Sequence, residues 1–360
     1  MLIVLSGGGT GGSVTPILAI AEELKKINPR AEFLFIGTKK GVPEKELAGA
    51  GGIFYQSICS GKLRRYFSWR NCFDPFLVLL GFFQSLFIIL KYKPAAIVSA
   101  GGFVAVPLSW AGWLCRTPVF IHQQDIIPGL ANKLITPLAK KITVSFSKSL
   151  KDFSKRKTVL TGNPIRTEIA GGDKKRAVER FNLETNLPTL LVVGGGTGAK
   201  KINELIYEIA PELVKLCQVI HLTGRQKPEI SNLKPEIPLR YHQYQFLNEE
   251  MPDALAAADL VVSRAGMGFL TELASLGKPT ILIPIQGSHQ ELNARHFAGR
   301  KAVILMEPKD LTSPILLEKI RQLIFSPDER SILSLNISRL AYPGAAKKIA
   351  GIILENIRLF

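Results

Sequence analysis

Residues 2–12 read LIVLSGGGTGG, an apolar run followed directly by a glycine-rich turn. The same pattern returns at residues 190–199, which read LLVVGGGTGA. Helical patterns follow both turns, at 17–27 and 202–216. Glycine lets the backbone approach a phosphate closely, and a helix N-terminus behind the turn offers N–H groups and the positive end of a dipole. Two such turns indicate two successive α/β halves, each with its own ligand-binding edge.

The rest of the chain alternates strands and helices around these turns. Apolar runs at 32–36, 95–99 and 119–121 are separated by helical patterns such as 104–114. Strands that are apolar on both faces and joined by helices are typical of a covered parallel sheet. The predicted fold class is α/β, with two Rossmann-like domains whose parallel sheets face each other across a cleft.

The two domains are expected to join in the region 160–188, which begins near the turn Gly162-Asn163-Pro164. We expect an N-terminal domain over 1–162 and a C-terminal domain over 163–340. The last segment, 341–360, follows a Pro-Gly break and is expected to form a helix that packs back on the first domain.

The composition is that of a globular protein whose positive net charge favours anionic partners. The chain has 360 residues, of which 46% are hydrophobic and 21% charged, and its net charge is +17. Such a charge favours nucleic acid, an anionic membrane surface or phosphorylated substrates as partners. The four cysteines do not have the spacing of a zinc site. We therefore expect a reduced cytoplasmic compartment.

A basic and aromatic segment, 62–70, precedes an apolar run at 76–90. Aromatic rings prefer the headgroup level, and each cation near an anionic surface gains about 1 kcal/mol. The run of fifteen residues is shorter than the roughly 20 that a span needs, so we expect a buried or membrane-grazing helix. A solvated loop or a site for single-stranded nucleic acid are the alternatives for 62–70. The expected membrane residues are Lys62, Arg64, Arg65, Phe67, Trp69 and Arg70.

The glycine turns match a dinucleotide-binding pattern formally, but one partner is missing. An acidic residue after the second strand would hold the ribose of NAD, and that strand ends in Ile36-Gly37-Thr38. NAD is therefore disfavoured. Tight turns without any ligand are the alternative for the pair.

A third glycine turn, Ser263–Gly268, opens a helix that carries Thr271 and Glu272. N–H groups at a helix start suit a diphosphate, and a carboxylate one turn later suits ribose hydroxyls. Further on, the Gln290 and Asn293 amides share one helix face and could bond sugar hydroxyls. Glu272 could instead only cap or solvate its helix.

Taken together, seven ordered blocks of the chain resemble the MurG family of glycosyltransferases, family 28, which have the GT-B fold. The blocks are residues 8–12 (GGTGG), 101–103 (GGF), 122–125 (HQQD), 162–166 (GNPIR), 194–199 (GGGTGA), 263–266 (SRAG) and 289–290 (HQ). The resemblance runs from residue 1 to about 300.

The resemblance implies transfer of GlcNAc from UDP-GlcNAc to a polyprenyl-diphosphate-linked muramoyl-pentapeptide, lipid I, to give lipid II for peptidoglycan. It implies an inverting reaction at the cytoplasmic face of a bacterial cell membrane, by a peripheral protein without cofactor, metal or nucleic acid. A different lipid acceptor such as diacylglycerol, or a non-catalytic basic membrane-binding module, are the alternatives.

The resemblance also assigns residues to the two substrates. Thr10, Gly11 and Gly12 would face the acceptor diphosphate and the reacting sugar. Leu247 would line the uracil pocket, and Gln290 would contact the GlcNAc hydroxyls. The donor site is expected to comprise Arg166, Gly196, Thr197, Leu247, Gly266, Met267, Gly268, Phe269, Leu270, Thr271, Glu272 and Gln290.

The chain departs from the family pattern where a catalytic base is expected. Ser13 stands where the family usually has His, and a hydroxyl is not a base near neutral pH without a partner. The family's His-Glu-Gln-Asn block reads His122-Gln123-Gln124-Asp125. Asp125 is the hypothesis for the base and for acceptor binding, with Ser13 and His122 as further catalytic candidates. His122 could also be a satisfied core histidine.

Overall fold

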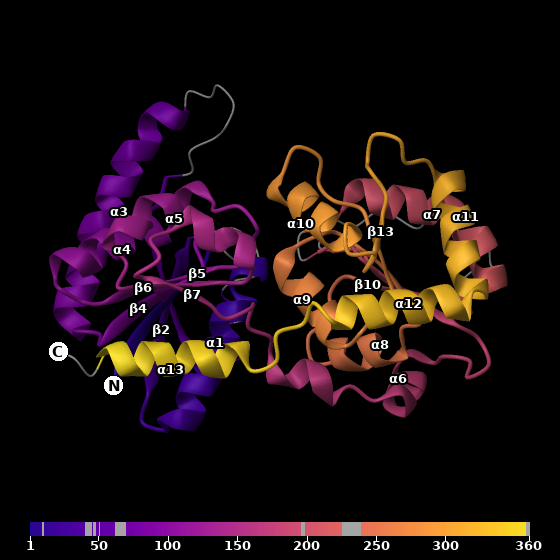
Figure 1. The fold of residues 1–360 in the computed structure, drawn as a ribbon, viewed down its shortest axis with the longest axis horizontal. Coiled ribbons are helices and arrows are strands. Elements are labelled where there is room, and N and C mark those ends of the chain that lie inside the picture. The colour runs from indigo at the N-terminus through magenta and orange to yellow at the C-terminus, as the bar shows by residue number, and fades with distance from the viewer. Residues whose placement is uncertain are drawn as a thin grey trace. The chain divides into compact units, whose positions relative to one another are not determined.

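The computed structural model describes residues 1–8, 11–39, 45, 48–49, 51–61, 70–195, 199–224 and 239–357. The side chains of residues 11 and 70–72 lie outside this description. The chain forms two compact units, Met1–Arg166 with Tyr342–Phe360, and Thr167–Ala341 (Figure 1).

The first unit is built on a seven-stranded parallel sheet in the order β3-β2-β1-β4-β5-β6-β7. Its central strands β1, β4 and β5 are almost entirely buried, as a sheet covered on both faces requires. The strand bounds are β1 Leu2–Ser6, β2 Glu32–Thr38, β3 Phe54–Ile58, β4 Ala96–Ser99, β5 Val119–Gln123, β6 Lys141–Val144 and β7 Thr158–Leu160.

Helices cover both faces of this sheet. They are α1 Thr15–Ile27, α3 Arg70–Tyr92, α4 Ala105–Leu114, α5 Leu130–Ile135 and α13 Ala345–Ile357, with short 3-10 turns including η1 Gly11–Ser13. On one face α13 lies alongside α1 (Figure 1) and buries Ile349 and Ile353 in the same core cluster as Ile20 and Leu24. The last helix of the chain therefore completes the core of the first unit.

The second unit repeats the design with six parallel strands in the order β10-β9-β8-β11-β12-β13. The strands are β8 Thr189–Val193, β9 Gln218–Leu222, β10 Tyr241–Tyr244, β11 Leu260–Ser263, β12 Thr280–Leu282 and β13 Ile304–Leu305. The helices are α6 Lys174–Phe181, α7 Lys200–Leu216, α8 Met251–Ala257, α9 Met267–Ser275, α10 His289–Ala298, α11 Ser313–Phe325 and α12 Pro327–Ser338. The predicted α/β class with two parallel-sheet, Rossmann-like halves is confirmed.

The region 160–188 is not a simple connection. It contains β7's end, the 3-10 turn Thr167–Gly171 and helix α6, whose first turn is capped by Asp173. Helix α6 is held on the second unit because Arg176 bonds the buried Asp253 of α8, with 2.6 Å between Nη2 and Oδ1. The division between the units falls after Arg166, four residues beyond the expected boundary at 162.

Candidate functional site

Each sheet reverses its strand order beside its first strand. In the first unit the reversal lies between β1 and β4, and in the second between β8 and β11. Ligands of open α/β sheets bind outside the carboxyl ends of the strands at such a point. Described glycines occupy these positions: Gly7, Gly8, Gly101 and Gly102 in the first unit, and Gly194, Gly195 and Gly266 in the second. The fold thus creates one candidate site in each unit.

In the first unit, two glycine turns approach each other with no room for a side chain. A Cβ on Gly102 would stand 2.6 Å from the backbone N of Gly8 and 2.7 Å from its O. Gly101 and Gly102 have positive φ angles of 93° and 92°, a conformation that favours glycine. The ends of β1 and β4 therefore form a surface of bare backbone, suited to an anionic group.

Ser13 lies under the first turn and is only 7% exposed. Its Oγ donates to the carbonyl of Gly8 at 3.4 Å, and a Cβ on Gly7 would stand 2.6 Å from the Ser13 O. Ser13 thus packs against the turn that precedes it. Of the expected acceptor residues, Gly11 and Gly12 belong to η1, whereas Thr10 lies outside the described residues.

Asp125 is half-buried just beyond the end of β5. The Gln123 amide donates to the carbonyls of Asp125 (2.7 Å) and Ile127 (3.1 Å), and so fixes the backbone of this loop. Gln123 Oε1 in turn accepts from Asn132 Nδ2 at 2.7 Å. The Asp125 carboxylate is consequently carried by a rigid loop at the same edge of the sheet as the glycine turns.

Asn132 is a site residue that the sequence reasoning missed. It is 5% exposed, and its Oδ1 has no hydrogen-bond partner in the described part of the chain. A Cβ on Gly101 would stand 2.9 Å from that oxygen. The only signal in the sequence was a lone amide on the buried face of α5. Its position beside Gly101 makes it a candidate acceptor for a donor group of a ligand.

His122 is 1% exposed at the end of β5 and uses both ring nitrogens inside the protein. Nε2 lies 2.8 Å from Asn163 Oδ1, and Nδ1 lies 3.0 Å from Thr143 Oγ1. Burial lowers the pKa of His122 to about 4. A neutral, enclosed imidazole of this kind does not reach a substrate hydroxyl, which favours the core-histidine interpretation.

In the second unit, α7 begins directly after the second glycine turn, of which Gly196 and Thr197 lie outside the described residues. The start of α7 is fixed by Asn203, whose Nδ2 donates to the Thr223 carbonyl at 2.9 Å. Asn203 Oδ1 lies 3.1 Å from Nε2 of the buried His221. The N-terminus of α7 is therefore held beside the ends of β8 and β9.

The turn after β11 opens α9 with Gly266 as its N-cap. Thr271 donates to the Met267 carbonyl at 2.7 Å, and Glu272 is 4% exposed. Of the other expected donor residues, Met267, Gly268 and Leu270 are buried and Phe269 is half-buried. The Arg264 guanidinium donates to two carbonyls at the end of β12, Ile283 and Pro284, at 3.0 Å each, and burial lowers its pKa. A cation and a helix N-terminus thus lie at the same strand ends.

The structure places Gln290 next to this turn. Its Nε2 is 3.9 Å from where a Cβ on Gly266 would lie, and its Oε1 accepts from the Ile285 N–H at 3.3 Å. Asn293 Nδ2 donates to the Ala265 carbonyl at 3.3 Å and ties α10 to the same turn. Leu247 is buried beyond the end of β10, at the same edge of the sheet. The expected donor residues of this unit that are described therefore share one edge.

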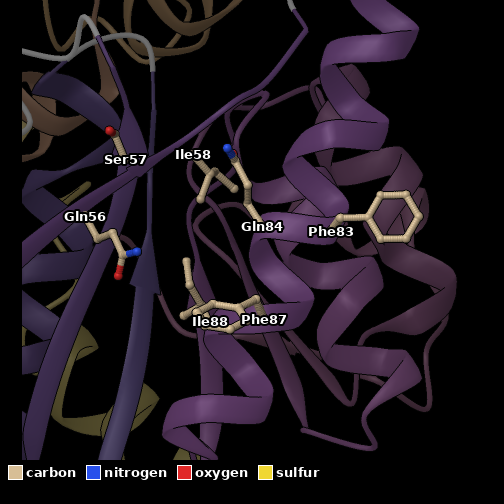
Figure 2. A pocket seen from close by; sticks show the side chains of 7 residues that line it. All are labelled: Gln56, Ser57, Ile58, Phe83, Gln84, Phe87 and Ile88. Carbon is tan, nitrogen blue, oxygen red and sulfur yellow. The ribbon is translucent and has the colours of Figure 1, made fainter.

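A separate hollow of about 370 Å³ lies between β3 and α3 (Figure 2). It is lined by Gln56, Ser57, Ile58, Phe83, Gln84, Phe87 and Ile88, none of them in a glycine turn. Among the described residues, no group of three or more His, Cys, Asp or Glu is placed to hold a metal ion.

Helix α3 is longer than the apolar run indicated. It spans 23 residues, and Phe73–Tyr92 are long and apolar enough to cross a membrane by length and composition. The length of the apolar run therefore does not by itself exclude a span, and the buried or membrane-grazing helix stays a prediction. The inner face of α3 packs on the core through Ile88 and Ile89, and its outer face exposes Phe76, Phe83 and Phe87 by 71%, 57% and 69%. Of the cationic segment, Lys62, Arg64, Arg65, Phe67 and Trp69 lie outside the described residues, and Arg70 begins α3.

Comparison with known proteins adds sequence and structural relatives. Residues 3–144 match the glycosyltransferase family 28 N-terminal domain, and residues 189–340 match the family 28 C-terminal domain. The chain is 39% identical over 357 residues to the UDP-N-acetylglucosamine–N-acetylmuramyl-(pentapeptide) pyrophosphoryl-undecaprenol N-acetylglucosamine transferase of Clostridium botulinum strain Hall, covering 98% of both chains. It is 40% identical to a transferase of the same name, numbered 2, from Bacillus cereus, covering 89% of this chain and 91% of that one.

Two solved structures extend the comparison. Acinetobacter baumannii MurG superposes with a TM-score of 0.72 at 25% identity, covering 99% of this chain and 100% of that chain. UDP-GlcNAc 2-epimerase from Neisseria meningitidis reaches a TM-score of 0.70 at 15% identity, covering 99% of this chain and 100% of that chain, and shares the fold alone.

Proposed function

The chain belongs to glycosyltransferase family 28, and on that premise we propose that it transfers GlcNAc from UDP-GlcNAc to lipid I, giving lipid II. The observation that carries the proposal is the pair of glycine-lined strand ends, one at the reversal point of each sheet. A reaction between a sugar diphosphate and a lipid diphosphate needs two anion-binding edges, and helix N-termini beside bare backbone supply them.

The second unit is proposed as the donor site. Backbone N–H groups at the starts of α7 and α9 would bind the diphosphate, with Arg264 nearby as a fixed positive charge. Glu272 would accept from the ribose hydroxyls, Leu247 would contact uracil, and Gln290 would bond the GlcNAc hydroxyls. By the family resemblance, Arg166 would supply a further cation to the nucleotide-sugar. The leaving UDP is then stabilised by dipoles and cations.

The first unit is proposed as the acceptor site, with Asp125 as the base. The acceptor hydroxyl oxygen forms a bond to the anomeric carbon of GlcNAc while the bond from that carbon to the UDP oxygen breaks. The hydroxyl proton passes to the Asp125 carboxylate, and the configuration at the anomeric carbon inverts. The backbone surface at Gly8 and Gly102 would bind the acceptor diphosphate.

Attachment to the cytoplasmic face of the membrane is proposed to run through α3. Part of this helix is packed on the unit and the rest exposes large apolar side chains, which is the pattern of a helix lying in the membrane interface. The cations of segment 62–70 would add attraction to anionic lipid. Gly81 fixes the packed face, because a Cβ there would stand 2.0 Å from the Cys59 carbonyl oxygen.

The direct test is incubation of the purified protein with UDP-GlcNAc and lipid I, followed by mass analysis of the lipid product. The proposal predicts a mass increase of one N-acetylhexosamine and release of UDP. Transfer to diacylglycerol instead of lipid I would contradict the proposed acceptor. Binding of anionic vesicles without binding of UDP-GlcNAc would indicate the non-catalytic alternative.

A further inference from the structure

Residues 162–166, here called the linker, lie where the chain leaves the first unit. They are hydrogen-bonded to a buried histidine that is distant in the sequence. His122 and Asn163 are 41 residues apart, yet His122 Nε2 lies 2.8 Å from Asn163 Oδ1, and both residues are at most 2% exposed. Asn163 directly precedes Pro164, and Arg166 follows at the last position of this part of the first unit. A side chain in the core of the sheet therefore holds the start of the linker.

The bond pattern sets the tautomer of His122. A carboxamide oxygen only accepts, so Nε2 carries the proton and donates it to Asn163. In the neutral ring Nδ1 is then an acceptor 3.0 Å from the Thr143 hydroxyl, whose proton also lies within reach of the Ile121 carbonyl at 3.3 Å. The low pKa of His122, about 4, keeps the ring neutral at physiological pH. Both nitrogens are thus committed to structural bonds.

The other side of the same segment is also fixed. Gly162 has a φ of +81°, and a Cβ there would stand 2.1 Å from the Cβ of Tyr342. The backbone N–H groups of Thr161 and Gly162 both donate to the Val144 carbonyl. The linker therefore leaves the sheet along a path that His122, β6 and Tyr342 define together.

We infer that His122 is a positioning residue for the donor substrate: by holding Asn163 it fixes the path of residues 162–166 and thereby the place of the Arg166 guanidinium. The inference rests on the proposed function, in which Arg166 binds the nucleotide-sugar. Pro164 limits the conformations between the two residues, so a shift at Asn163 is passed on to Arg166. His122 contributes to donor affinity without touching the donor.

Three variants separate this role from a general loss of stability. In His122→Asn, the side-chain amide lies near the former position of the histidine Nδ1 and cannot reach Asn163. In His122→Gln, the longer side chain places an N–H near the former position of Nε2. His122→Asn and Asn163→Ala are expected to raise the dissociation constant for UDP and the KM for UDP-GlcNAc about tenfold, as loss of one hydrogen bond implies. The KM for lipid I stays unchanged, and His122→Gln restores most of the donor affinity. Ile20→Ala, in the α1 core, is the control that lowers Tm without changing donor affinity.

The decisive measurement is the UDP affinity of His122→Asn in an Arg166→Ala background. If His122 acts through Arg166, His122→Asn changes UDP affinity there by less than about twofold, because coupled residues are not additive. Full additivity, unchanged UDP affinity in His122→Asn, or a loss confined to kcat would overturn the inference. A wild-type protein that binds UDP-GlcNAc but does not convert lipid I would contradict the proposed function instead, and the UDP titrations would still decide the role of His122.

Discussion

The backbone of Gly102 lies so close to that of Gly8 that a single added methyl group would stand 2.6 Å from the Gly8 nitrogen. The contact joins the turns after β1 and β4, where the strand order of the first sheet reverses. Substitution at this point should therefore disturb the proposed acceptor site selectively.

We expect Gly102→Ala to lower kcat/KM for lipid I by at least about tenfold, since a φ of +92° and the collision with Gly8 force the turn to move. UDP affinity, measured by titration calorimetry, should not change. Gly351→Ala, where the added group meets open space in α13, is the matched control and should leave activity intact. Wild-type kinetics in Gly102→Ala would show that the acceptor does not use this turn.

Asp125→Asn should lower kcat by about 10²-fold or more, the usual contribution of a positioned general base, with UDP affinity unchanged. Ser13→Ala should lower kcat less than about threefold, because the Ser13 hydroxyl is buried and bonded to Gly8. Steady-state kinetics with saturating UDP-GlcNAc checks both. If Ser13→Ala proves the more damaging variant, the base is not Asp125.

Gln290→Ala should raise the KM for UDP-GlcNAc about fivefold to tenfold, as loss of a hydrogen bond to the sugar would. The inhibition constant of UDP should stay the same, since Gln290 is proposed to contact the sugar and not the nucleotide. Equal losses for UDP and UDP-GlcNAc would place Gln290 at the nucleotide.

Stability should fall in mild acid partly because of His221. Burial lowers the pKa of His221 to about 3 in the folded protein, from 6.5. As the pH falls below 6.5 the unfolded chain takes up a proton that the folded chain refuses, so the stabilisation present above this pH is lost progressively. Between pH 7.5 and 5 the loss is about 2 kcal/mol. Thermal unfolding of His221→Gln should show a smaller drop in Tm over this range than wild type.

The triple variant Phe76→Ser, Phe83→Ser, Phe87→Ser should bind anionic vesicles at least about tenfold more weakly, since each exposed ring contributes apolar area to the membrane contact. Phe325→Ser, which removes a phenylalanine that is 66% exposed in the second unit, is the control. Vesicle co-sedimentation measures both. Equal binding by the triple variant would exclude α3 as the attachment surface.

The sequence predicted the elements whose pattern is local. Strands β1 and β8 are largely apolar runs that are each followed directly by a glycine, Gly7 and Gly194. It missed β10, an edge strand reading YHQY, because polar side chains on a solvent-facing edge lack the apolar signature. It also missed α6, where Ala177 and Phe181 are the only buried residues and all the others except Val178 are charged.

The sequence predicted the motifs of the candidate site, and the contacts between these residues come from the structure. Gln290 was identified from its helix face, and its place beside Gly266 follows only from the pairing of β11 with β12. The hydrogen bond between His122 and Asn163 joins residues that meet only after the sheet has formed. The same holds for Asn132, whose Oδ1 lies beside Gly101 and has no partner among the described residues. A local sequence pattern does not predict contacts between residues that are distant in the sequence.

The position of helix α13 at the end of the chain affects folding during translation. The first unit leaves Ile20 and Leu24 without their partners Ile349 and Ile353 until the ribosome has translated the whole second unit. A nascent chain stalled before residue 345 would therefore present an apolar groove to chaperones and proteases. Truncated chains should therefore be degraded more readily than the full-length chain.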